Sequence, residues 1–528
     1  MSNVRKLLTG AFGEDFVRFV LNAPDSGDIN SIPENAPAEV INLLVSIALD
    51  SAQNAFADVN FFAATRLASY VKSEEMSLVH ALRKECGGSP LETIEDPGDP
   101  VLFLLRQIAQ ACWPVYLINP TNSLEPSNFF SASPSVIMQH PKGLEAAEAF
   151  MRDSSLKALF PPRSEEALDQ PMSESAEWIV NIGGSGTRQI MGVMSGLLFD
   201  ARLRVALSGK VLTFGHLSES LEHSLAALRS LAEGEEVSVP AVIGFSGISL
   251  QAGQSIPFTD GVLREPRPTE RKLLLHGNGA IGAVYETTYP ARIFHVFQSS
   301  PESDDWAKPF KKYRARIEES FRSLEYSLDK VRLALVLSSD TDALLAPKEE
   351  SRTIIDPANL GGSVYWNTGD QTSPNTSIET EKHNALISIY DVIRKKHPES
   401  LNIAMKRLLS AVTSRRDSND ALIDALIAWE NIFGTRTETT FRVTASLAKI
   451  LSETPEERVE LQRELGKLYQ VRSSMVHGAK EPDPDSAAKN RERVIRVAIA
   501  ALRALYLERP ELLSMSPEDR SKRVLLEG

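Results

Sequence analysis

The spacing of hydrophobic positions changes along the chain and divides it into parts. In residues 1–155, apolar residues recur at three- and four-residue intervals, as in Ala38–Ala57 and Val101–Trp113, with polar turns between them. This period is typical of amphipathic helices. We therefore expect an all-helical N-terminal region.

Residues 175–337 show a different pattern, in which glycine, proline and polar turns separate short apolar runs. Most of these runs contain β-branched or aromatic residues, which favour strands. The predicted strands are Leu203–Leu207, Val211–Phe214, Ala241–Leu250, Lys272–His276, Ala280–Glu286, Ile293–Phe297 and Val331–Leu337. With a helix inserted around His216–Ala232 and a charged helix over Asp304–Lys330, the pattern predicts a mainly β middle domain.

Residues 338–377 are rich in Ser, Thr, Asp, Pro, Asn and Gly. This composition is typical of a linker or of a long loop laid over a domain. Tyr365 and Trp366 indicate that part of the segment is held in place.

Helical spacing returns in residues 378–510 and is strong there. The six predicted helices are Ile378–Lys395, Ser400–Thr413, Ser418–Phe433, Thr437–Leu451, Thr454–His477 and Asp485–Leu507. Thr454 and Glu457 form a capping box, and Gly434 and Gly478 stand where glycine ends helices. Residues 511–528 predict a tail with a short helix. The expected fold class is thus α+β and multidomain, ending in an all-α bundle.

Composition limits the functions that this chain can have. A hydrophobic content of 42% and a charged content of 24% are ordinary for globular protein. The net charge of −13 argues against non-specific coating of DNA or anionic membrane. Cys86 and Cys112 show neither metal-ligand spacing nor a disulfide framework, so we expect structural thiols. Without a signal peptide or an apolar run long enough to cross a bilayer, a cytoplasmic protein is expected.

Two glycine-rich segments could be mistaken for nucleotide-binding loops. Gly277–Gly282 matches G-x-G-x-x-G, but strand-like residues follow it and Asn278-Gly279 favours a hairpin turn. Gly183–Gly186 could hold an anion, yet it lacks the P-loop lysine and turn chemistry explains it equally well. A nucleotide-binding enzyme is therefore supported by that one loop.

Other hydrolase chemistries find no support in the sequence. His276, His295, His383 and His397 are scattered without partner spacing, and we expect surface or core histidines. No zinc-hydrolase H-E-x-x-H and no serine-hydrolase G-x-S-x-G occurs.

The most informative pair is Arg472 and His477, at the predicted end of a long helix. Residues five apart lie about 140° apart around an ideal helix. The two can face each other only where the helix ends, and Gly478 marks such an end. A histidine can move a proton near neutral pH, and a guanidinium can hold a phosphate. A surface arginine and a histidine that caps the helix remain the alternative.

Glu430 lies among apolar neighbours near the end of the predicted helix Ser418–Phe433. A carboxylate there is either a solvated helix end or a buried partner for a cation such as Arg472. Burying it without a partner would be costly.

These two helix ends resemble the ApeA-like branch of the HEPN superfamily. The family pattern ALExLF is similar to Ala428-Trp429-Glu430-Asn431-Ile432-Phe433, where Trp429 replaces a leucine. The pattern LYxxRSxxVHG is similar to Leu468-Tyr469-Gln470-Val471-Arg472-Ser473-Ser474-Met475-Val476-His477-Gly478. The resemblance covers residues 380–510, about a quarter of the chain.

The resemblance implies a helical bundle that forms a homodimer or a higher homo-oligomer and cleaves RNA, such as tRNA or mRNA, without metal or cofactor. It implies that His477 is the general acid and base, that Arg472 stabilises the charge on the phosphorus, that Ser473 orients one of them and that Glu430 fixes Arg472. It further implies an effector of prokaryotic anti-phage defence or a toxin, in which the upstream regions sense a phage or host trigger. The alternative is a non-catalytic HEPN-type module for RNA binding or dimerisation.

Overall fold

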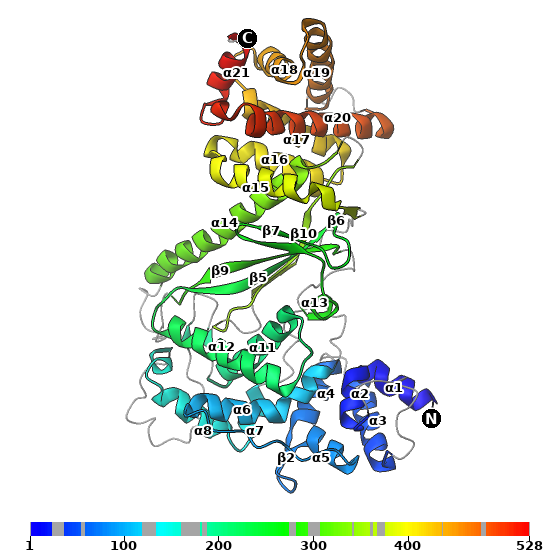
Figure 1. Cartoon of the computed structure of the whole chain (residues 1–528), viewed down its shortest axis with the longest axis vertical. Coiled ribbons are helices and arrows are strands. Elements are labelled where there is room, and N and C mark those ends of the chain that lie inside the picture. The colour runs from blue at the N-terminus through cyan, green and yellow to red at the C-terminus, as the bar shows by residue number, and fades with distance from the viewer. Residues whose placement is uncertain are drawn as a thin grey trace.

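The chain is described by a computed structural model, in which the N-terminal helices, a central sheet and the C-terminal helices follow one another along the long axis (Figure 1). The structure describes residues 2–23, 36–53, 59–118, 134–159, 180–181, 187–188, 190–273, 281–293, 307–340, 343–358, 363–366, 375–435, 437–476 and 482–526. Over these residues the chain is mostly helical with a small antiparallel sheet in the middle, which agrees with the expected α+β class. No helix within these ranges is long and apolar enough to cross a membrane.

The N-terminal part is helical, as its spacing predicts. Its helices are α1 (Ser2–Phe12), α2 (Glu14–Val20), α3 (Ala38–Gln53), α4 (Val59–Ala68), α5 (Leu78–Glu85), α6 (Pro100–Cys112), α7 (Pro134–Gln139) and α8 (Gly143–Arg152). A two-stranded ribbon of β1 (Tyr70–Val71) and β2 (Met76–Ser77) was not expected. Asp99 caps α6 by accepting from the amides of Val101 and Leu102. Burial raises the pKa of Cys112 to about 12, which keeps this thiol protonated as a core group.

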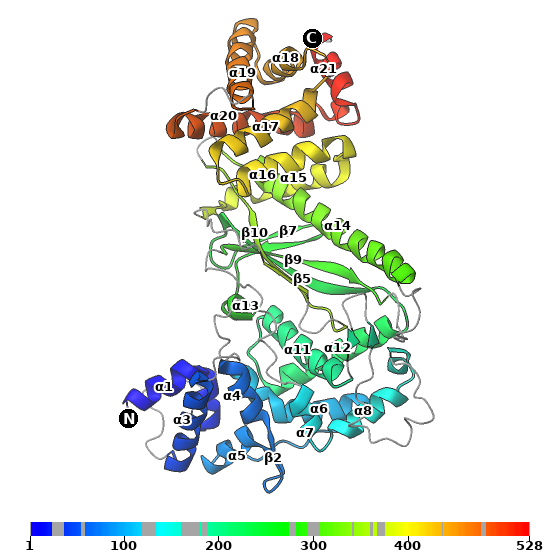
Figure 2. The ribbon, with the colours of Figure 1, turned by 180° about the vertical axis from the view of Figure 1, so that it is seen from behind.

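The central sheet has six antiparallel strands in the order β11-β10-β5-β9-β8-β7. Their bounds are β5 (Val237–Ser246), β7 (Ser255–Phe258), β8 (Gly261–Arg264), β9 (Ala283–Ala291), β10 (Lys348–Ile354) and β11 (Ser363–Trp366). Three helices, α11 (Ile190–Ser208), α12 (Phe214–Ala232) and α14 (Ala307–Leu337), cover it. Figures 1 and 2 show α11 and α12 on one side of the sheet and α14 on the other.

Two of the predicted strands are helical, and the middle part is therefore mixed rather than mainly β. Leu203–Leu207 lies in α11, and Val331–Leu337 is the last part of α14. Both runs are buried on nearly every side, so the apolar spacing that separates a helix from a strand is lost. Val211–Phe214 is not a strand either, because α12 begins at Phe214 and Thr213 caps it.

Other predicted strands of the middle part are found in part. Ala241–Leu250 corresponds to β5 and to β6 (Ile248–Ser249), and Ala280–Glu286 corresponds to the start of β9. The run Lys272–His276 begins inside α13 (Pro268–Leu273) instead. Most of Ile293–Phe297 and the turn at Asn278-Gly279 lie outside the described residues.

The segment 338–377, expected as a linker or loop, contributes β10 and β11 to the sheet. β10 pairs with β5 from Ile354, opposite Ala241, to Lys348, opposite Ser246. Most of its side chains are polar yet buried. Lys348 pairs with Glu350 at 2.9 Å, and Ser246 donates to Glu350 at 2.6 Å. A strand held by such contacts lacks the hydrophobic pattern that reveals strands.

All six helices predicted for the C-terminal part are confirmed. They are α15 (His383–Lys396), α16 (Asn402–Thr413), α17 (Ser418–Phe433), α18 (Thr439–Leu451), α19 (Pro455–Val476) and α20 (Pro484–Arg503). The capping box at the start of α19 is also confirmed: the amide of Glu457 donates to Thr454 Oγ1 and the amide of Thr454 donates to Glu457 Oε2. Trp429 ties α17 to α20 by donating from Nε1 to the carbonyl of Val494 at 3.1 Å.

The tail forms a firmly docked helix, α21 (Pro517–Leu526). The Arg520 side chain is fully buried and pairs with no carboxylate within the described part of the chain. Its guanidinium donates to the carbonyls of Ile432 at 2.6 Å, Leu512 at 3.0 Å and Met515 at 2.9 Å. Ile432 lies in the last turn of α17, whose carbonyls would otherwise lack partners. Arg520 thus fixes the end of α17 to the start of α21.

We expect Arg520→Met to lower the free energy of unfolding of the bundle by about 2–4 kcal/mol, because it removes the guanidinium donor from the carbonyls of Ile432, Leu512 and Met515. Urea unfolding and amide hydrogen exchange in the last turn of α17 measure this effect. Lys522→Met, an exposed change on the same helix, should stay within about 0.5 kcal/mol. Equal stability of both variants would show that Arg520 does not fix this junction.

Candidate ribonuclease site

Arg472 and Glu430 meet where α19 passes the end of α17. Arg472 Nη1 donates to Glu430 Oε1 at 2.8 Å. Both side chains are partly buried, with exposed fractions of 29% and 26%. Of the two alternatives for Glu430, the structure shows the ion pair with Arg472 rather than a solvated helix end.

Gly434 fixes the turn that carries Glu430. Its amide donates to the carbonyl of Glu430 at 2.6 Å. A Cβ atom at position 434 would lie 2.2 Å from that carbonyl oxygen, so any other residue would push the turn aside. The glycine that follows α17 therefore also fixes the backbone from which the Glu430 side chain extends.

Burial sets the electrostatics of this pair. It raises the pKa of Glu430 above its ordinary value, and the charge of Arg472 opposes the rise. Burial also raises the pKa of Tyr469, whose hydroxyl is near both groups; the charge of Glu430 adds to this rise and Arg472 opposes it. Tyr469 is therefore a neutral phenol at physiological pH.

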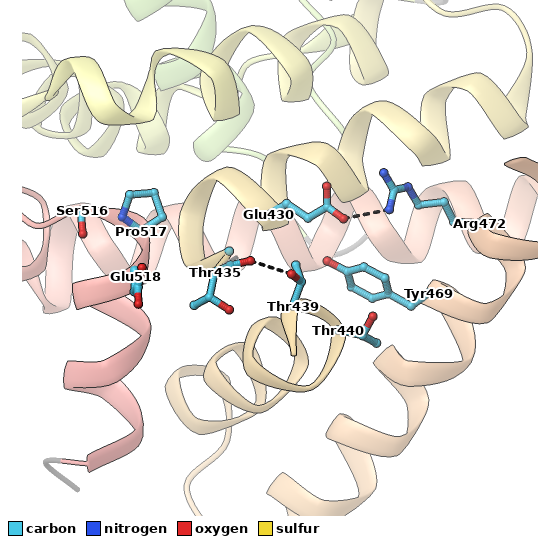
Figure 3. A pocket seen from close by; sticks show the side chains of 10 residues that line it. Glu430, Thr435, Thr439, Thr440, Tyr469, Arg472, Ser516, Pro517 and Glu518 are labelled. Atoms are coloured by element: carbon cyan, nitrogen blue, oxygen red, sulfur yellow. Dashed lines mark hydrogen bonds and ion pairs between the residues drawn. The ribbon is translucent and has the colours of Figure 1, made fainter. Parts of the chain in front are cut away.

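The ion pair lines an open cavity of about 720 Å³ between the ends of α17 and α19, the start of α18 and the start of α21. Figure 3 shows Arg472 at one end, Ser516 and Glu518 at the other, and Glu430, Thr435, Thr439 and Tyr469 between them. A guanidinium in an open cavity of this size can bind an anionic group of a larger ligand.

Of the other two predicted site residues, one lies away from the cavity and the other lies outside the described residues. Ser473 follows Arg472 on α19, but its side chain is exposed and does not line the cavity. His477 and Gly478 lie outside the described residues, and the described part of α19 ends at Val476. The structure thus brings together Arg472 and Glu430 of the four.

Several residues of the cavity were not singled out from the sequence. Tyr469 stands in the run that carries the resemblance, so a signal for it existed. Thr435 and Thr439 follow the end of α17, where only Gly434 had drawn attention. Glu518 reaches the cavity because α21 packs against α17 and α18, and no local pattern announces that contact.

Of the other histidines and loops considered from the sequence, one histidine is a core residue and several candidates lie outside the described residues. His397 contacts Tyr506 through Nδ1 and Asn402 through Nε2, and burial lowers its pKa, as expected for a core histidine. The glycine-rich loop Gly183–Gly186 lies outside the described residues, as do His276 and His295. Within the described ranges, no three His, Cys, Asp or Glu side chains are grouped as metal ligands would be.

We expect the raised pKa of Glu430 to make stability fall as pH rises. A carboxyl group with a higher pKa in the folded state binds more protons there than in the unfolded state. The folded protein therefore loses stability as the pH rises from 4.5, the ordinary pKa of the glutamate side chain, to the higher pKa of Glu430 in the folded state. Urea unfolding of wild type and Glu430→Gln across this window measures the difference. Glu457 is the control of opposite sign: the Thr454 amide lowers its pKa, so the stability it contributes is lost as pH falls. A wild type that gains stability over Glu430→Gln with rising pH would contradict the prediction.

Comparison of the chain with protein-family models, with curated proteins and with solved structures found no match.

Proposed function

We propose that this chain is a metal-independent endoribonuclease of the HEPN type. The observation that carries the proposal is the ion pair between Glu430 and Arg472 at 2.8 Å, which lines an open cavity in a helical bundle. The two helices that provide it, α17 and α19, are those whose sequences resemble the family.

In the proposed reaction, the ribose 2′-hydroxyl attacks the adjacent phosphorus and the bond to the 5′-oxygen breaks. His477 takes the proton of the hydroxyl as general base and then, as imidazolium, gives a proton to the 5′-oxygen that leaves. Arg472 stabilises the negative charge that develops on the phosphorus oxygens, Glu430 holds Arg472 in place and Ser473 orients either His477 or Arg472. The products are a 2′,3′-cyclic phosphate and a 5′-hydroxyl.

We further propose that the protein is a defence effector or toxin, that it acts as a homodimer on tRNA or mRNA, and that its upstream parts sense a phage or host trigger. Contacts between the sheet and the bundle support such coupling. Asp260, in the turn between β7 and β8, accepts from Tyr390 at 2.8 Å and from Arg394 at 2.6 Å, both on α15. Arg503 of α20 donates to the carbonyl of Ser339, beyond the end of α14, at 2.8 Å.

The purified chain, incubated with tRNA or total RNA in EDTA, should give fragments with 2′,3′-cyclic phosphate and 5′-hydroxyl ends. Fragments with 5′-phosphate ends, or cleavage that requires added Mg²⁺, would contradict the proposed chemistry. Binding of RNA without cleavage would instead favour a non-catalytic HEPN-type module.

A further inference from the structure

The cavity beside Arg472 has two ends with opposite hydrogen-bonding character. At one end, the Tyr469 hydroxyl and Arg472 Nε are buried and have no hydrogen-bond partner among the described residues. The Tyr469 side chain is only 6% exposed. Tyr469 and Arg472 both line the open cavity, and buried donors are usually paired, so an unpaired donor on each of these two residues indicates a ligand with acceptor oxygens.

The other end presents acceptors. Thr435 and Thr439 donate their hydroxyl hydrogens to the carbonyls of Thr437 at 2.5 Å and Thr435 at 2.6 Å. Ser516 donates its hydrogen to Asp519 at 2.7 Å. These hydroxyls therefore offer only lone pairs to a ligand, and the exposed carboxylate of Glu518 offers more.

The acceptor end is held in place before any ligand arrives. Glu518 stands in the first turn of α21, two residues before the buried Arg520 that binds the end of α17. Ser521 of the same helix hydrogen-bonds with Ser446 of α18 at 2.9 Å in the interior. A preformed wall loses little freedom on binding, so its contacts can contribute to selectivity.

We propose that this cavity is a nucleotide subsite, in which Tyr469 and Arg472 bind a backbone phosphate and Glu518 accepts from the exocyclic amino group of the base. The subsite rests on the proposed ribonuclease function and adds to it the selection of a base. Adenine, cytosine and guanine carry such an amino group, whereas uracil has the carbonyl oxygen O4 where cytosine has its amino group. The one ring donor of uracil, N3–H, lies between two carbonyl oxygens that repel the carboxylate. Without a base donor, Glu518 would only repel the polyanion, so it discriminates as well as binds.

Tyr469→Phe separates a substrate contact from a structural one. The change keeps the ring and removes a buried hydroxyl that has no partner among the described residues, so thermal stability should stay equal or rise. RNA affinity should nevertheless fall about three- to tenfold, because one hydrogen bond to the phosphate is lost. A loss of stability with unchanged affinity would show that the hydroxyl serves the fold.

Base selection is tested with labelled C6 and U6 hexamers, which share a ring size, by fluorescence anisotropy in EDTA on the full-length His477→Ala chain. We expect about tenfold tighter binding of C6 than of U6, the size typical of one well-placed base contact. Glu518→Gln added to this chain should reduce the ratio to less than about threefold, since its amide can also donate to uracil. Glu456→Gln, an exposed carboxylate in the first turn of α19, should leave the ratio unchanged.

The outcomes separate this subsite from the ribonuclease itself. If the wild type cleaves RNA but the ratio of C6 to U6 affinity is the same with Glu518 and with glutamine at that position, the proposed subsite is rejected and the proposed ribonuclease function is retained. If the wild type does not cleave RNA but the ratio of C6 to U6 affinity depends on Glu518, the proposed subsite is retained and the proposed ribonuclease function is rejected. A ratio near one in the parent chain overturns the subsite in either case.

Discussion

We expect His477→Ala to slow RNA cleavage by about 10²- to 10⁴-fold at neutral pH, the contribution of a positioned general acid or base. In the proposed reaction the imidazole moves the proton of the 2′-hydroxyl, which neither Arg472 nor Glu430 can do. A guanidinium remains protonated at any physiological pH, and Glu430 is already occupied by Arg472 at 2.8 Å. Cleavage of tRNA in EDTA under single-turnover conditions measures this rate directly.

Binding and growth separate this effect from unfolding. Because the ion pair and the cavity lie on other residues, His477→Ala should bind RNA nearly as tightly as the wild type. His223→Ala, which changes an exposed histidine on α12, should cleave at the wild-type rate. If expression of the wild type is toxic to cells, His477→Ala should relieve that toxicity. Equal cleavage by wild type and His477→Ala would reject the ribonuclease assignment.

The C-terminal helices could be predicted because their signals are local. Thr454 and Glu457 are three residues apart and satisfy each other's amides, so the start of α19 follows from four letters. The bounds of α17 match the predicted Ser418–Phe433, since Asp417 caps its start and Gly434 follows its end. Such signals need no knowledge of the tertiary fold.

The middle part was predicted less well because its elements depend on tertiary contacts. α11 is buried along nearly its whole length, and its apolar residues on all sides hide the helical period. β10 is the opposite case: Lys348 and Glu350 are buried as a pair, and Arg352 is held by Glu349 at 2.7 Å. A charged strand inside a sheet can be identified only when its partners are known.

The site shows the same division between local and distant signals. Arg472 and Glu430 are 42 residues apart, yet each lies near the end of a predicted helix and a buried Glu430 needs a cationic partner, so their contact could be proposed. Glu518 could not be found in this way, because it reaches the cavity only through the docking of α21 by Arg520. The buried Arg520 donates to carbonyl groups and to the Ser400 hydroxyl rather than to a carboxylate, so no charged partner in the sequence reveals it.

The second large effect is expected at Arg472, where Arg472→Lys should lower cleavage by about 10²- to 10³-fold. The guanidinium donates to Glu430 through Nη1, and its Nε has no partner among the described residues, so the group keeps donors for a phosphate oxygen. A lysine carries the same charge at a single point and cannot bridge both groups with fixed geometry. Glu430 then captures the ammonium and leaves the developing charge on the phosphorus without its donor.

Steady-state kinetics decide what Arg472 does in the proposed reaction. A loss mainly in kcat places the lost interaction in the transition state, whereas a loss confined to KM means that Arg472 binds substrate and transition state equally. Arg463→Lys is the matched control, because Arg463 is exposed on the same helix about two and a half turns earlier, and this variant should stay within about twofold. If Arg472→Lys also stays within that range, charge alone suffices. Simultaneous hydrogen bonding of the Arg472 guanidinium to Glu430 and to the phosphate would then have no part in catalysis.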